Sequence, residues 1–109
     1  MIELTKIERK ILDLIPEGIN RKISIREISK LINLNHRRIY EIINHLRKKG
    51  VPICAIKQGK VKDRGYFIAM NERERALGLH HYNSQIIDMQ RTVAHVEQAN
   101  LHEWREYIN

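Results

Sequence analysis

Seven of the side chains between residues 36 and 47 of this 109-residue chain form a candidate cluster of hydrogen-bond donors and acceptors. They are His36, Arg37, Arg38, Tyr40, Glu41, Asn44 and Arg47. Arginine offers paired donors that match the edge of guanine, and asparagine matches adenine in the same way. The cluster therefore indicates base reading in the major groove of double-stranded DNA. The plainer alternative is a solvated helix face, since charged residues on helices usually form only that.

A second group of cations follows in the segment KQGKVKDRG, where the only acid is Asp63. Its members are Lys57, Lys60, Lys62 and Arg64. The formal net charge of the chain is +7. Residues 1–70 hold 16 Lys and Arg against 7 Asp and Glu, hence +9, while residues 71–109 hold 4 against 6, hence −2. A basic surface gains affinity for phosphates by releasing counterions, so we expect the first seventy residues to bind a polyanion.

Catalytic and metal-binding patterns are weak by comparison. His95 and His102 are seven residues apart, and His102 with Glu106 has a spacing that can hold a metal on a helix, but no Cys-x-x-Cys or His-Glu-x-x-His pattern accompanies them. There is also no glycine-rich phosphate loop and no Gly-x-Ser-x-Gly motif. We expect no enzyme activity, no catalytic residues, no cofactor and no metal. Cys54 is the single cysteine, and its apolar surroundings predict a buried structural thiol.

Three helices are expected to position the first cluster. Thr5 and Glu8 form a capping box before an apolar stripe that Pro16 ends, and Ser24 and Glu27 form a second one. The stripe of the second helix comprises Ile25, Ile28, Leu31 and Ile32. The segment Asn33–Leu34–Asn35 predicts a tight turn with Asn35 as the next N-cap. The third helix buries Ile39, Ile42, Ile43 and Leu46 and ends at Gly50.

A β-hairpin is expected to carry the second cluster. Residues 51–56 (VPICAI) and 66–70 (YFIAM) read as strands, and glycines at 59 and 65 allow sharp turns between them. Lys22 and Ile23 predict a short extended piece before the second helix. The fold class is mainly α with a small antiparallel β-hairpin (α+β), a winged helix-turn-helix followed by a C-terminal helix. The predicted division is a DNA-binding domain at 1–70 and a helical segment at 71–109.

The segment LNHRRIYEIINHLRKKGVPI, followed later by RGYFIA, resembles the N-terminal winged helix of the biotin operon repressor and related small bacterial and phage regulators. The likeness covers about residues 5–70. It implies that residues 36–44 stand where such proteins read bases and that residues 57–64 form the wing. The wing is longer and more basic than the loop of that repressor, and no biotin-ligase domain follows, so ligase activity and biotin binding are not implied.

The last segment contains a regular apolar stripe. Asn71 and Glu74 predict a helix start, and Gly78 weakens the continuation or marks a kink. Leu79, Tyr82, Ile86, Met89, Val93 and Val96 then follow at alternating steps of three and four. Such a heptad seam is typical of a short coiled coil, so we expect a homodimer through this helix. The alternative is that the stripe packs on the domain's own helices.

These features favour a small transcriptional regulator, of bacterial or phage origin, that binds specific sequences in double-stranded DNA. Two alternatives stay open. A winged helix can serve as a protein-docking module, for example in a phage factor that captures a host protein, or it can bind an origin and recruit replication proteins through its tail. No apolar run is long enough to span a bilayer, and the N-terminus lacks signal-peptide architecture, so the expected location is the cytoplasm without membrane contact.

Overall fold

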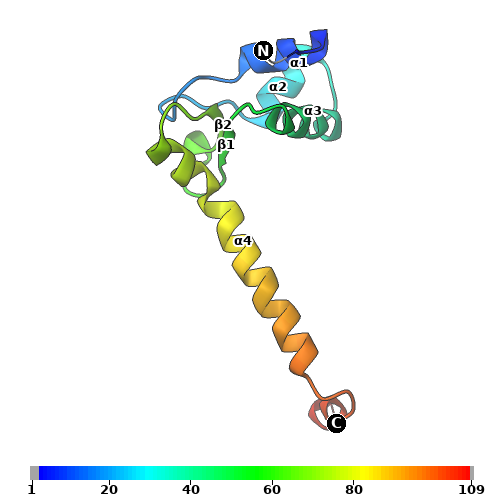
Figure 1. Ribbon diagram of the computed structural model, residues 1–109. Coiled ribbons are helices and arrows are strands. Elements are labelled where there is room, and N and C mark those ends of the chain that lie inside the picture. Colours follow the sequence, from blue (N-terminus) through cyan, green and yellow to red (C-terminus); the bar gives the residue numbers. More distant parts are fainter. Residues whose placement is uncertain (1–2, 109) are drawn as a thin grey trace.

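The computed structural model describes residues 3–108, and the predicted boundaries at residues 1 and 109 lie outside this range. Three short helices and a two-stranded hairpin form a small domain, from which one long helix, α4, projects (Figure 1). The molecule measures 57 × 32 × 31 Å along its principal axes. The mainly helical α+β fold class predicted from the sequence is therefore confirmed.

Helices α1 (Lys6–Leu14) and α2 (Ile25–Ile32) begin at the predicted capping boxes. The side chain of Thr5 accepts from the amide of Glu8, and Ser24 accepts from the amide of Glu27. Asn33 then adopts a left-handed conformation with φ of 54°, which ends α2 and turns the chain toward α3. These starts were predictable because each cap involves residues only three positions apart.

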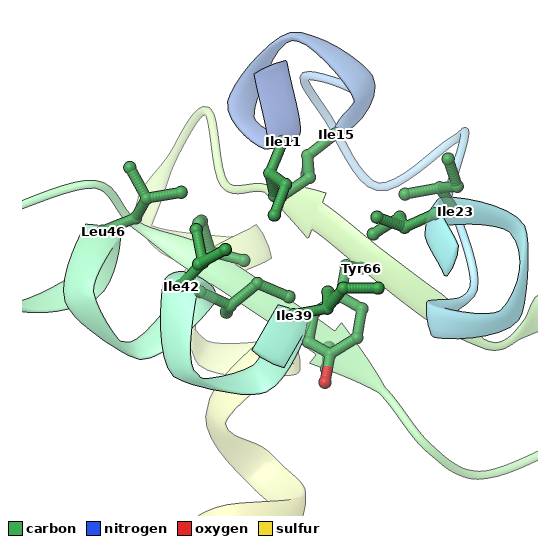
Figure 2. Close-up of a cluster of buried hydrophobic side chains, with 11 residues drawn as sticks. Ile11, Ile15, Ile23, Ile39, Ile42, Leu46 and Tyr66 are labelled. Carbon is green, nitrogen blue, oxygen red and sulfur yellow. The ribbon is translucent and has the colours of Figure 1, made fainter. Parts of the chain in front are cut away.

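Helix α3 (His36–Lys48) begins at Asn35, whose side chain accepts from the amide of Arg38 at 2.8 Å. Its apolar face is buried as expected, and Figure 2 shows Ile39, Ile42 and Leu46 facing Ile11 of helix α1. The core formed by α1, α2, α3 and the hairpin consists of Ile11, Ile15, Ile23, Ile28, Ile39, Ile42, Ile43, Leu46, Ile53, Ala55 and Tyr66. Burial of this face fixes which side of α3 remains in solvent.

The predicted stripe of α2 is wrong at one position. Leu31 is 64% exposed, whereas Ile28 is fully buried. At 100° per residue Leu31 lies about 60° round the helix from Ile28, on the side away from Ile25 and Ile32. The short α2 turns the side of these three isoleucines toward the core, which leaves Leu31 in solvent.

The hairpin pairs β1 (Ile53–Ile56) with β2 (Gly65–Ile68) in antiparallel register, Ile53 opposite Ile68 and Ala55 opposite Tyr66. Both strands are shorter than predicted, and Met70 lies beyond β2 with 67% of its surface exposed. The expected extended piece at Ile23 is present and bridges the other edge of β2 through two backbone hydrogen bonds with Tyr66. This third segment covers an edge that would otherwise expose unpaired backbone groups.

The two faces of the hairpin pack against different helices. Ile53 and Ala55 belong to the core of the three-helix domain, whereas their neighbour Cys54 lies opposite Phe67 on the other face. Gly78 of helix α4 covers that second face, and a Cβ at this position would lie 2.7 Å from Sγ of Cys54 and 3.3 Å from Cζ of Phe67. Burial raises the pKa of the Cys54 thiol. The expectation that Cys54 is buried is thus confirmed.

Helix α4 (Glu72–Gln98) begins at the predicted N-cap Asn71 and runs through Gly78 without interruption. Gly78 therefore does not interrupt the helix, and the absence of a side chain at this position permits close contact with the hairpin. The helix ends at Gln98, Ala99 is extended, and a 3-10 helix, η2 (Glu103–Ile108), follows. The helical spacing assumed for His95, His102 and Glu106 does not exist, since the chain leaves the helix between the two histidines.

Among the helices of residues 3–108, none combines the length and the apolar character that crossing a membrane requires. Within the same residues, no group of three or more His, Cys, Asp or Glu side chains lies close enough to hold a metal ion.

Candidate nucleic-acid interface

The solvent side of helix α3 carries most of the residues singled out in the sequence. Arg37, Glu41 and Asn44 follow one another at spacings of four and three and are exposed. Residues at these spacings share one face of a helix. Exposed Lys48 continues the same row, although the sequence analysis did not assign it. Lys48 lies four residues after Asn44, and this spacing could have predicted that it belongs to the same helix face.

Glu41 lies between two arginines on this face. Its carboxylate is 3.7 Å from Nε of Arg37 and 3.4 Å from Nη1 of Arg38. The Arg37 side chain is 91% exposed, whereas that of Arg38 is 48% exposed. Exposed ion pairs of this kind are weak and screened by salt, so an approaching anion can replace the carboxylate. Arg37 is thus the more accessible of the two guanidinium groups.

Tyr40 connects α3 to the hairpin. An open groove is lined by Tyr40 together with Lys57, Val61, Arg64 and Tyr66 of the hairpin and its tip, here defined as residues 57–64. Burial raises the pKa of the Tyr66 hydroxyl to about 12, so this group stays neutral at physiological pH. One side of the exposed face of α3 and the basic tip therefore border a common depression. This adjacency is the geometric relationship that the sequence pattern alone could not establish.

The four cations of the tip have different surroundings. Arg64 donates from Nε and Nη2 to the carbonyl oxygen of Gly59, at 2.9 and 2.7 Å, and so closes the loop on itself. Lys57 lies with its Nζ 5.3 Å from the ring centroid of Tyr82 in helix α4. Within the described residues, the side chains of Lys60 and Lys62 have no hydrogen-bonded or ionic partner, and both are exposed. These two lysines are the tip cations available to an anion.

Arg47 is placed differently from the rest of its cluster. Its Nε donates to the carbonyl oxygen of Ile53 at 2.9 Å, and its Nη2 donates to the hydroxyl of Tyr82 at 3.3 Å. A further contact joins Nη1 to Oδ1 of Asn44 at 3.3 Å. The sequence assigned Arg47 to DNA, whereas the structure shows its guanidinium joining α3 to β1 and α4.

Some of the positive charge of residues 1–70 lies outside this surface. Lys6, Arg9 and Lys10 of helix α1 line a separate depression near the start of the chain. Arg9 is paired there with Asp13 at 3.3 Å. Lys49 is paired with the buried Glu8 at 2.6 Å, which fastens the end of α3 to α1. The candidate surface on α3 and the tip therefore contains only a part of the basic residues of 1–70.

The predicted dimer seam is divided by the structure. Leu79 and Tyr82 line a groove between α4 and β1, whereas Ile86, Met89, Val93 and Val96 are 53 to 69% exposed on the projecting part of the helix. A scan against models of protein families, a search of curated proteins and a search of solved structures find no match to this chain.

Proposed function

We propose that this chain is a winged helix-turn-helix protein that binds specific sequences in double-stranded DNA and acts as a small transcriptional regulator. Helix α3 is the recognition helix in this proposal, and the hairpin tip is the wing. The observation that carries it is the common groove of Tyr40 with Lys57 and Arg64, because it places the exposed face of α3 beside a cationic loop. A helix in the major groove flanked by a basic loop on phosphates is an established way of reading DNA.

The residues of the interface have distinct roles in the proposal. Arg37 and Asn44 offer the side chains that match guanine and adenine, and Glu41 can accept from the amino group of cytosine. Lys48, Lys60 and Lys62 lie at the edges and supply contacts to phosphates, which add affinity without sequence preference. His36, Arg38 and Tyr40 flank this row. Arg47 is left out, since it is bound within the protein.

The test is a selection of random duplexes by the purified chain at two salt concentrations. We expect an enriched motif at both concentrations, with affinity that falls steeply as salt rises. Binding to all duplexes alike, or no binding at the lower salt concentration, would contradict the proposal. A chain that docks only on proteins would give the second result.

A matched pair of variants links the selection to the interface. Arg37→Ala and Arg91→Ala each remove one positive charge, but Arg91 lies on the projecting part of α4 beside Asp88. Loss of the enriched motif in the first variant and its retention in the second is the expected result.

A further inference from the structure

The projecting part of helix α4 has an apolar face that the domain does not cover. We define the free seam as Ile86, Met89, Val93 and Val96, whose exposed fractions are 53%, 69%, 55% and 69%. Figure 1 shows this part of α4 extending away from the helices and strands of the domain. An isolated helix of about 12 to 15 residues is only marginally stable in water, and most helical stability comes from packing of an apolar face. Packing of the free seam against a partner would therefore stabilise this part of the helix.

The first turns of α4 use the same face for the domain. Gly78, Tyr82 and Ile86 succeed one another at spacings of four, so they lie on one side of the helix. Gly78 is packed against Cys54, and the hydroxyl of Tyr82 accepts from Arg47. The domain is thus packed against the seam side of α4 as far as about Tyr82. A second helix can approach this side only beyond that point.

We infer that two copies of this chain associate through their free seams with the α4 helices antiparallel. In a parallel pair, Leu79 and Tyr82 of one helix would face the same residues of the other helix. At this height along α4 the domain of each chain is already packed against its own helix. In an antiparallel pair each helix ends before it reaches the partner's domain. Ile86 then faces Val96 of the second copy, and Met89 faces Val93. Both contacts form in one alignment, because the two pairs of positions have the same midpoint along α4. Each residue thereby meets an apolar side chain, as the a and d layers of a coiled coil require.

The charges along α4 agree with this orientation. The positions beside the free seam are Gln85, Gln90, Thr92 and Glu97, so the middle of the seam is uncharged and neither orientation meets repulsion there. At the end of the chain, residues 97–108 hold three glutamates and one arginine, hence a net charge of −2. An antiparallel pair brings this acidic tail to the partner's Arg47 and Lys57, which have no acidic partner within residues 3–108. A parallel pair would place two acidic tails together, which is unfavourable.

The antiparallel pair also covers the groove at the base of α4. This groove is lined by Val51, Pro52, Ile53, Cys54, Leu79 and Tyr82 together with Arg47 and Arg75. The partner's tail carries Leu101 and Trp104, which are 79% and 49% exposed. Pairing centred between Met89 and Val93 brings that tail opposite Leu79 and Tyr82. The two apolar surfaces left open in the single chain are thereby placed together.

Disulfide trapping distinguishes the orientations. The variants Ile86→Cys and Val96→Cys are purified separately, oxidised alone and then oxidised as a mixture. We expect a cross-linked dimer only in the mixture, because positions 86 and 96 face each other while two copies of position 86 lie about 15 Å apart along the helix axis. Disulfides need Cα atoms within about 7 Å. The unchanged chain, with buried Cys54, should not cross-link.

Cross-linking of either variant alone would show a parallel pair and overturn the orientation. Sedimentation equilibrium of the unchanged chain provides the second measurement, and a monomer at all concentrations would overturn the association itself. Val93→Glu should shift the association constant at least tenfold toward monomer, whereas Arg91→Gln, which also changes the charge by −1 but lies on the opposite side of α4, should leave it unchanged. Neither measurement involves DNA, so their outcome is independent of the proposed DNA binding.

Discussion

The hydroxyl of Tyr82 accepts a hydrogen bond from Nη2 of Arg47 at 3.3 Å, and the guanidinium carbon of Arg47 lies 5.4 Å from the centroid of the Tyr82 ring. One arginine of helix α3 is thereby joined to the helix that leaves the domain. Its Nε is bound to the carbonyl oxygen of Ile53 in the hairpin. The side chain of Arg47 thus joins helix α3 to strand β1 and to helix α4.

Arg47→Ala should therefore reduce stability more than the loss of a surface charge does. The carbonyl of Ile53 loses a partly buried donor, and such a loss costs about 1–3 kcal/mol of unfolding free energy. Arg37→Ala, on the exposed row of the same helix, should stay within about 0.5 kcal/mol of the unchanged chain. Urea denaturation followed by circular dichroism measures both values. Equal unfolding free energies of the two variants would show that the contacts of Arg47 do not stabilise the fold.

Acidification should weaken the domain through Glu8. Its hydrogen bonds with the Lys49 ammonium and the Thr5 amide lower the pKa of the Glu8 carboxyl from 4.5 to about 2. A carboxyl with a lowered pKa stabilises the folded state above its unfolded pKa, and this contribution disappears as the pH falls through the folded pKa. We expect the unfolding temperature to fall between pH 4.5 and about 2, and to fall less steeply in Glu8→Gln. Identical pH profiles of the two proteins would contradict this assignment.

Gly78→Ala should destabilise the chain even though alanine favours helices by about 1 kcal/mol over glycine. The new methyl group would overlap Cys54, and overpacking of this kind costs about 1–3 kcal/mol. Ser84→Ala, further along α4, serves as a control that adds no overlap. The double variant Gly78→Ala with Cys54→Gly should recover part of the lost stability. A rise in unfolding temperature in the single variant would show that the close contact does not constrain this position.

Arg37→Ala should lower the affinity for the selected duplex by about 1–3 kcal/mol and relax the choice of base at one position. Its effect on random duplexes should be smaller. On the selected duplex the variant loses both a base contact and a positive charge, whereas on random duplexes it loses only the charge. Fluorescence anisotropy with both duplexes measures the difference. If the variant lost the same free energy on both, Arg37 would be a phosphate contact only.

Lys60→Gln should weaken binding to specific and random duplexes alike and reduce the slope of log affinity against log salt by about 1. Arg64→Gln provides a contrast, because its guanidinium holds the loop at Gly59 and its loss should disturb the whole tip. Titrations at four salt concentrations give both slopes. An unchanged slope in Lys60→Gln would place this lysine away from the phosphates.

The sequence by itself determined the helices, their starting points and the apolar face of α3. Thr5 with Glu8 and Ser24 with Glu27 interact within one turn, so their effect does not depend on the rest of the fold. The hairpin was likewise visible, because short strands and glycines between them are local signals. Only the ends of the strands were misplaced.

The tertiary structure decided how the same residues are used. Arg47 has the same residue type as Arg37, yet contacts with β1 and α4 bind it within the protein, and no periodicity reveals them. The heptad seam is regular along the chain, but the domain occupies its first part and leaves the remainder free. Both distinctions arise from contacts between elements far apart in sequence, where burial and partners depend on packing and not on spacing.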